Sequence, residues 1–264
     1  RRQAREGREQ QAMTAPETPR PFHDEVPPSQ QRGRGDLARG KGRLGMHSVG
    51  FVGALIQLHR AFSGASPSDR FHVLGRFLSC PFLRVVRRLP PTARLLDLGS
   101  GHGILAQLVA ATPRATFVLA VEPDIRKLWA GRPTPKLVRI GAFSDAVAAS
   151  GSFDAVTICD VLCRVPVAGW DPILATAHQA LKPGGKLLLK EIDPANRLKG
   201  LWNRAQEKFL ADGLGMTLGE AFSYETKEQM TTRLEALGFT DVQTHYLGTL
   251  YPHAHLLYEA VKAA

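Results

Sequence analysis

Short apolar segments alternate with amphipathic ones through the last two thirds of the chain. The apolar segments resemble strands buried on both faces of a parallel sheet, and they span residues 95–98, 116–122, 136–140, 153–160 and 181–191. Segments with helical periodicity come between and after them, at 102–112, 124–130, 171–181, 197–212 and 226–237. This alternation predicts βαβ units, and hence an α/β fold with a doubly wound, mostly parallel sheet.

The end of the chain follows a different pattern. Residues 239–247 and 255–261 alternate more strongly between apolar and polar positions, and a short loop at 248–254 joins them. Two such segments predict an antiparallel hairpin that closes the sheet. We therefore assign residues 91–264 to one sheet domain.

A glycine-rich turn follows the first predicted strand. From Leu95 to Gly103 the sequence is Leu-Leu-Asp-Leu-Gly-Ser-Gly-His-Gly, so a buried strand passes into a turn and then a helix. Glycines there leave backbone N–H groups bare, which suits a nucleotide cofactor. A dinucleotide-binding turn has a third glycine where Ile104 stands, and Asp97 would repel a pyrophosphate, so the spacing disfavours a dehydrogenase. The alternative is a glycine-rich connection without a ligand.

Acidic residues stand at the ends of the predicted strands. Glu122 ends the second strand, roughly 20 residues after the glycine turn, and its two oxygens can accept both hydroxyls of a ribose. Asp160 ends the fourth strand, and Glu191 and Asp193 end the fifth. Because ligands of such sheets bind beyond the carboxyl ends of the strands, we expect these groups on one rim with Asp97.

The glycine turn, the strand order and the Pro-Gly-Gly turn at 183–185 together resemble the class I S-adenosylmethionine-dependent methyltransferases, over about residues 90–262. The resemblance implies a seven-stranded sheet with a C-terminal antiparallel hairpin, and S-adenosylmethionine as cofactor. It implies that the Asp97 turn holds the methionine moiety, that Glu122 holds the ribose, and that residues after the third and fourth strands border the adenine and close the pocket. The cofactor-binding residues implied in this way are Asp97, Gly99, Ser100, Gly101, Gly103, Glu122, Pro123, Ala142, Phe143, Asp160 and Val161.

Catalytic and acceptor-binding residues are less clearly encoded. Transfer of a methyl group from a sulfonium requires mainly that donor and acceptor are held together, and a base is needed only if the acceptor loses a proton. Glu191 is the candidate base or orienting group, and the alternative is a carboxylate paired with Lys190 or another neighbour. The candidate acceptor contacts are Arg164, Asp193, Tyr224 and His253. The sequence contains no cluster of carboxylates and histidines that would indicate a catalytic metal.

Composition separates the ends of the chain from its sheet domain. The 264 residues carry a net charge of +10, of which residues 1–45 supply ten Arg/Lys and six Asp/Glu, and residues 60–94 seven Arg and one Asp. Residues 1–45 have few aliphatic side chains, so we predict a disordered basic tail. Three cysteines, Cys80, Cys159 and Cys163, fit no disulfide framework, which favours a reducing compartment, the cytoplasm.

Residues 46–90 are predicted to form N-terminal helices that act as a cap or lid. In the segment 68–89, Phe71, Leu74, Phe77 and Leu78 have helical spacing. One interpretation is a helix pair that covers the sheet edge with its arginines in water. The other is a surface for anionic lipid or nucleic acid. Nucleic acid is disfavoured because no aromatic residues alternate with the arginines, whereas peripheral membrane contact through residues 60–94 stays open.

These observations favour a methyltransferase that acts on a small, apolar or amphiphilic molecule. One rival hypothesis is an enzyme that uses the same scaffold on RNA or protein. The other is a non-catalytic module that keeps the cofactor cradle.

Overall fold

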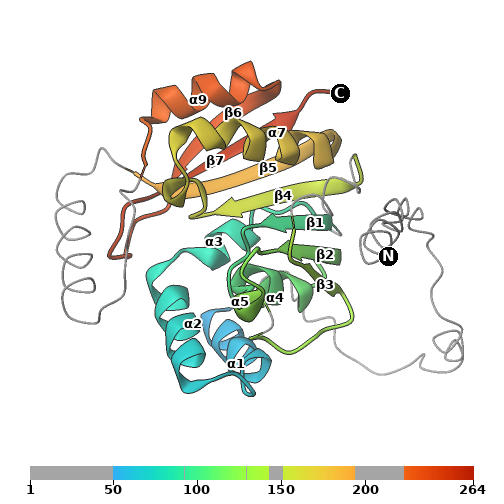
Figure 1. Ribbon diagram of the computed structural model, residues 1–264, viewed down its shortest axis with the longest axis vertical. Coiled ribbons are helices and arrows are strands. Elements are labelled where there is room, and N and C mark those ends of the chain that lie inside the picture. The colour runs from blue at the N-terminus through green and yellow to red at the C-terminus, as the bar shows by residue number, and fades with distance from the viewer. Residues whose placement is uncertain (1–49, 92, 129, 143–150, 194–222) are drawn as a thin grey trace, which may run out of the picture. The chain divides into compact units, whose positions relative to one another are not determined.

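The computed structural model describes residues 50–91, 93–128, 130–142, 151–193 and 223–264 (Figure 1). All of them belong to one compact unit, Met46–Ala264. The predicted tail, the predicted helix at 197–212 and the candidate residue Phe143 lie outside the described residues.

Seven strands form a single sheet in the order β3-β2-β1-β4-β5-β7-β6. Their bounds are Ala93–Leu98 (β1), Ala115–Val121 (β2), Leu137–Ile140 (β3), Phe153–Cys159 (β4), Leu181–Ile192 (β5), Phe239–Tyr246 (β6) and His255–Lys262 (β7). Strands β1 to β5 run parallel, and β7 pairs antiparallel with both β5 and β6. The predicted parallel sheet and its closing hairpin are both confirmed.

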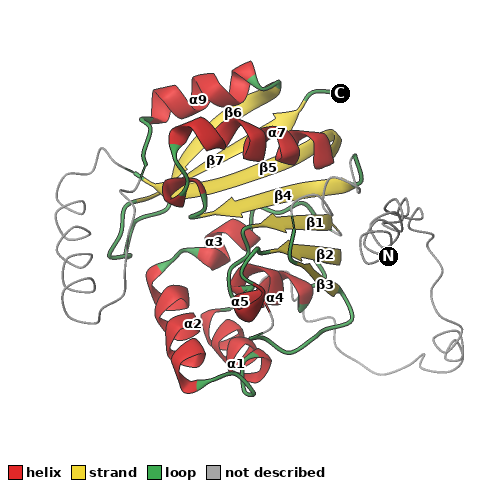
Figure 2. Ribbon diagram, viewed as in Figure 1, coloured by secondary structure: helices red, strands yellow, loops and turns green. Residues whose placement is uncertain are grey.

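Helices cover both faces of the sheet, which explains why its strands are apolar throughout (Figure 2). In β1, Leu95 packs with α4 (Ile104–Ala110), whereas Leu96 and Leu98 pack with α7 (Trp170–Ala180) and α9 (Lys227–Ala236). Short helical turns, α5 (Ile125–Leu128), η2 (Leu162–Arg164) and η3 (Val167–Gly169), follow β2 and β4. The helix predicted at 124–130 is therefore shorter than expected.

Three N-terminal helices lie on the α4 face: α1 (Phe51–Ala61), α2 (Pro67–Ser79) and α3 (Phe82–Val86). Helix α1 confirms the helix expected just after residue 46, and it packs on α4, where the Gln57 side chain donates a hydrogen bond to the Gln107 carbonyl oxygen. None of the helices in the described segments combines the length and the apolar character that a bilayer span needs.

The interpretation of a helix pair that keeps its arginines in water is only partly correct. The helices share one buried cluster with α4, and of the four apolar residues with helical spacing in the segment 68–89 only Phe77 is buried. The arginines are also not all in water. The Arg84 guanidinium donates to the Leu247 and Thr249 carbonyl oxygens, and Arg88 pairs with Glu259 of β7 at 3.2 Å. Both arginines contact residues near the C-terminal end of the chain. No local sequence pattern reveals such long-range contacts.

A buried ion cluster links α2 to the sheet. The Lys190 ammonium of β5 lies 2.5 and 2.6 Å from the two carboxylate oxygens of Asp160, and the Arg76 guanidinium of α2 lies 2.7 Å from one of them. Burial by itself raises the pKa of Asp160, but the charges of Lys190 and Arg76 outweigh it and hold that pKa below its usual range. Asp160 therefore stays ionised inside the protein and fixes the end of β4 to both elements.

We expect Lys190→Met to lower the free energy of unfolding by about 3 kcal/mol, because it leaves a buried carboxylate with only one cation. The matched control is Lys182→Met, since Lys182 also lies on β5 and pairs with an aspartate of β4, Asp154, but in a partly exposed place. That change should cost less than about 1 kcal/mol. Urea denaturation of both variants measures the difference, and equal losses would contradict a buried, tightly held Asp160.

Candidate functional site

The turn between β1 and α4 places three glycines in the left-handed region, with φ of 69° at Gly99, 56° at Gly101 and 76° at Gly103. This conformation strains any residue that carries a Cβ, which explains a glycine at every second position. At Gly99 space is limiting as well, because an added Cβ would lie 2.4 Å from Cγ2 of Val161. The loop after β4 therefore packs directly on the glycine turn.

Asp97 lies below this turn and is buried. Its Oδ1 accepts a hydrogen bond from the Thr157 hydroxyl at 2.7 Å, but its Oδ2 has no partner in the described part of the chain. Burial raises the pKa of Asp97 to about 7. The Ser100 hydroxyl is another buried polar group for which the described residues supply no partner. An acceptor left unpaired in the protein interior is costly, so this pair fits a ligand group that donates hydrogen bonds and carries positive charge.

Glu122 follows β2 and reaches across to the same turn. Its Oε2 accepts from the Gly101 backbone N–H at 2.8 Å, and its Oε1 accepts from the Asp124 N–H at 3.0 Å. A carboxylate has about four acceptor positions, so this group retains capacity for two further donors such as vicinal hydroxyls. The neighbouring candidates Pro123 and Ala142 are exposed beside it, at the ends of β2 and β3.

The two candidates after β4 have different surroundings. Val161 contacts the turn at Gly99, as a pocket-closing residue should. Asp160, in contrast, has both carboxylate oxygens engaged by Lys190 and Arg76, and its own φ is 57°. Asp160 therefore shapes the rim by fixing the loop after β4. The negative charge of its carboxylate is already balanced by Lys190 and Arg76.

Glu191 lies on the opposite face of β5 from Lys190, because successive residues of a strand point to opposite faces. The pairing with Lys190 is therefore wrong, whereas pairing with another neighbour holds for one of the two Glu191 oxygens. Glu191 Oε1 accepts from the backbone N–H groups of Val161 and Leu162 at 3.1 and 2.9 Å, while Oε2 is buried with no hydrogen-bond partner among the residues described. Burial, followed by the charge of Asp160, raises the pKa of Glu191 to about 7.

The four acceptor candidates are only partly brought together. Tyr224 shares a small cavity with Glu191, whose other walls include Trp170 and Tyr258. Asp193 directly follows β5, and its N–H donates to the Ala254 carbonyl oxygen at 2.8 Å, which ties it to the segment before β7. Arg164 is exposed on η2, and the His253 ring lies 5.9 Å from that of His255, which begins β7.

Helix α2 supplies contacts to the site that sequence reasoning missed. The His102 ring of the glycine turn lies 3.2 Å from an Asp69 carboxylate oxygen and 4.5 Å from the ring of His72. The only available signal was that Asp69 is the sole acid among residues 60–94. In the segments that the structure describes, no group of three or more His, Cys, Asp or Glu residues could hold a metal ion.

Comparison with known proteins adds to this geometry. The sequence profile of a family described as "Methyltransferase domain" matches residues 70–244. The demethylspheroidene O-methyltransferase of Rhodobacter capsulatus is 33% identical over 152 residues, which cover 56% of this chain and 37% of that protein. A ubiquinone biosynthesis O-methyltransferase of Xanthomonas axonopodis is 34% identical over 117 residues, which cover 41% and 47%. The chain thus spans less than half the length of either curated relative.

A solved structure shares the fold. The S-adenosylmethionine-dependent methyltransferase from Mesorhizobium loti superposes with a TM-score of 0.53 at 19% identity, over 69% of this chain and 98% of that one. At this identity the likeness concerns the arrangement of strands and helices. It agrees with the strand order and the closing hairpin described above.

We expect Gly99→Ala to be clearly more destabilising than Gly101→Ala. Both introduce a Cβ at positive φ, at a cost of about 1–2 kcal/mol, but only the first pushes against Val161, which adds about 1–3 kcal/mol. Gly101 is the matched control, because a Cβ there meets nothing within 4 Å. Chemical denaturation measures both, and equal stabilities would show that the β4 loop does not pack on the turn.

Proposed function

The chain belongs to the methyltransferase-domain family, and from that premise we propose that it transfers a methyl group from S-adenosylmethionine to a hydroxyl oxygen of a small, apolar or amphiphilic molecule. The seven-stranded sheet is that of class I methyltransferases. The observation that carries the proposal is the unpartnered Oδ2 of Asp97 beneath a left-handed glycine turn. It is an acceptor in need of a donor, in the place where the cofactor's charged amino group would lie.

The proposed roles follow from the contacts of each residue. Asp97 and Ser100 hold the methionine end, and Glu122 holds the ribose hydroxyls with the acceptor positions that Gly101 and Asp124 leave free. Gly99 and Gly103 provide the bare backbone of the turn. Pro123, Ala142, Phe143 and Val161 line the remaining rim, and Asp160 keeps Val161 in position through its ion cluster.

The acceptor proposal draws on the relatives and on Glu191. Both relatives described above are named O-methyltransferases. One is named for demethylspheroidene and the other for ubiquinone biosynthesis. A hydroxyl acceptor loses its proton when its oxygen takes the methyl group, so a base near neutrality is useful. Glu191 Oε2, with its raised pKa, is the proposed proton acceptor. Bound S-adenosylmethionine supplies the methyl group on a sulfonium, as an electrophilic carbon with a good leaving group.

In this proposal the protein itself holds the acceptor and covers the site. Tyr224 lines the same small cavity as Glu191, and we propose that it contacts the acceptor from that side of the site. Asp193, Arg164 and His253 are proposed as further acceptor contacts from the ends of β5, β4 and the segment before β7. Helices α1 to α3, in the segment 46–90, serve as a cap, since α2 contacts the turn through Asp69 and His72.

Calorimetric titration with S-adenosylmethionine and S-adenosylhomocysteine tests the proposal, with NADH as the control. We expect both sulfur compounds to bind and NADH not to bind. Binding without methyl transfer to any hydroxylated lipid-like acceptor would favour a non-catalytic module. Absence of binding by a folded protein would overturn the proposed function.

The affinity for S-adenosylmethionine should also depend on pH. Asp97 must be ionised to attract a cation, and its pKa of about 7 means that it becomes neutral as the pH falls below that value. The dissociation constant should therefore rise as the pH is lowered through about 7, by up to about tenfold per pH unit. Asp97→Asn should bind weakly and with no such dependence. The same titration over a pH series measures both.

Two substitutions separate the possible roles of Glu191. In Glu191→Gln the side-chain oxygen still accepts from Val161 and Leu162, but the titratable group is gone; Glu191→Leu removes both functions. If Glu191 is the base, both variants lose turnover, by about 100-fold or more, and the rise of kcat through pH 7 disappears, while cofactor affinity of the Gln variant is unchanged. If Glu191 only positions the loop, the Gln variant stays active.

A further inference from the structure

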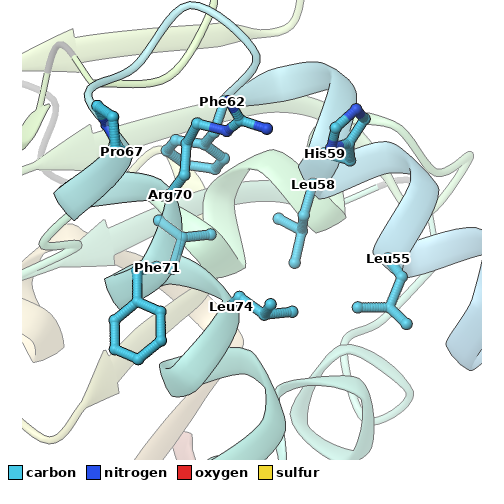
Figure 3. Close-up of a pocket in the computed structure, with 9 residues that line it drawn as sticks. Leu55, Leu58, His59, Phe62, Pro67, Arg70, Phe71 and Leu74 are labelled. Carbon is cyan, nitrogen blue, oxygen red and sulfur yellow. The ribbon is translucent and has the colours of Figure 1, made fainter.

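Helices α1 and α2 enclose an apolar groove on the outside of the α4 face. Figure 3 shows Leu55 and Leu58 of α1 and Leu74 of α2 pointing into the space between the helices, with Phe71 beside it. The groove has a volume of about 450 Å³, and its walls also include Phe62, Pro67 and Val73.

Large apolar side chains remain exposed around this groove. Of the ten such side chains in the described segments, six lie on α1 and α2: Phe71 (81% exposed), Val52 (67%), Phe51 (51%), Leu78 (50%), Ile56 (48%) and Leu74 (46%). On α1, Val52 and Ile56 lie four residues apart, and on α2, Phe71, Leu74 and Leu78 are spaced at i, i+3 and i+7. Such concentration of apolar surface indicates a contact with another apolar phase or molecule.

The charges around the groove are positive. Of the six arginines in residues 50–91, Arg76, Arg84 and Arg88 contact the sheet and its end loops, and the one acid, Asp69, already engages His102 and Ser66. Arg70 and His59 line the groove, and Arg60 is exposed next to His59. Exposed apolar side chains with a basic border are the combination that binds a bilayer interface containing anionic lipid.

We propose that the outer surface of α1 and α2, defined by these six apolar side chains with Arg60 and Arg70, docks onto an anionic lipid bilayer. Two other occupants fit less well. The segment 1–45 has few aliphatic side chains and is itself positive, so the basic border repels it. A second copy of the chain related by twofold symmetry would bring the same arginines together.

Docking has a consequence for the proposed function, although binding itself requires no cofactor. On α2, Asp69, His72 and Arg76 share a stripe at i, i+3 and i+7 that contacts the glycine turn and Asp160, while Phe71, Leu74 and Leu78 occupy another. One helix therefore connects the bilayer surface to the site. An enzyme held at the membrane surface would thus have access to an apolar acceptor dissolved in that membrane.

The test is flotation of the full chain with vesicles of phosphatidylcholine alone and of phosphatidylcholine mixed with phosphatidylglycerol. We expect binding to the mixed vesicles and its reduction by roughly tenfold or more in the double variant Phe71→Ser, Leu74→Ser. Both side chains are exposed, so the fold should be retained. The matched control is Val138→Ser, Leu250→Ser, which removes exposed apolar side chains from β3 and the loop before β7 and should bind normally.

Three outcomes would overturn the proposal. The first is that the wild-type chain does not bind mixed vesicles. The second is that the Phe71, Leu74 variant binds as well as the control, which would assign binding to the basic tail. The third is that sedimentation shows a dimer that this variant alone disrupts. Salt dependence adds a further readout, because binding through the tail alone should disappear at high salt, whereas apolar insertion should leave a measurable remainder. Cofactor titration of the variant is independent, so failure here leaves the proposed function separately testable.

Discussion

The loop after β4 is held from both faces of the sheet by two consecutive residues of β5, and the rest of the site depends on this arrangement. Lys190 neutralises Asp160 on one face, while Glu191 accepts the backbone N–H groups of Val161 and Leu162 on the other. Val161, fixed in this way, packs against Gly99 and so defines the space above the glycine turn. Arg76 extends the same cluster to the N-terminal helices.

The three acids at the ends of β1, β4 and β5 share burial but differ in pairing. Asp160 has two cations beside it, so its pKa stays below its usual range and it serves structure. Asp97 and Glu191 each keep one oxygen without a partner within the described residues, and burial raises the pKa of both to about 7. Residues that retain unmet hydrogen-bonding capacity in this way are the ones suited to meet a ligand or a proton.

The N-terminal helices have two faces with different roles. One stripe of α2 contacts the glycine turn and Asp160, and the other carries exposed apolar side chains. A cap with only a structural role would bury Phe71, Leu74 and Leu78, whereas all three are exposed. Their exposure makes this region an interaction surface as well as a cover.

The sequence by itself determined the fold and the candidate cofactor-binding residues, because both depend on local signals. Continuous apolar strands, alternating helices and a turn that only glycine tolerates specify a parallel sheet with its ligand rim, and they place Asp97 and Glu122 at strand ends. The partners of buried charges could not be predicted this way. Asp160 meets Arg76, 84 residues earlier, and Lys190, 30 residues later. Likewise Glu191 turns away from its neighbour Lys190, and α2 buries Phe77 while exposing Phe71. Only the tertiary structure decided these contacts, because each depends on how distant elements pack and on which face of the sheet a side chain meets.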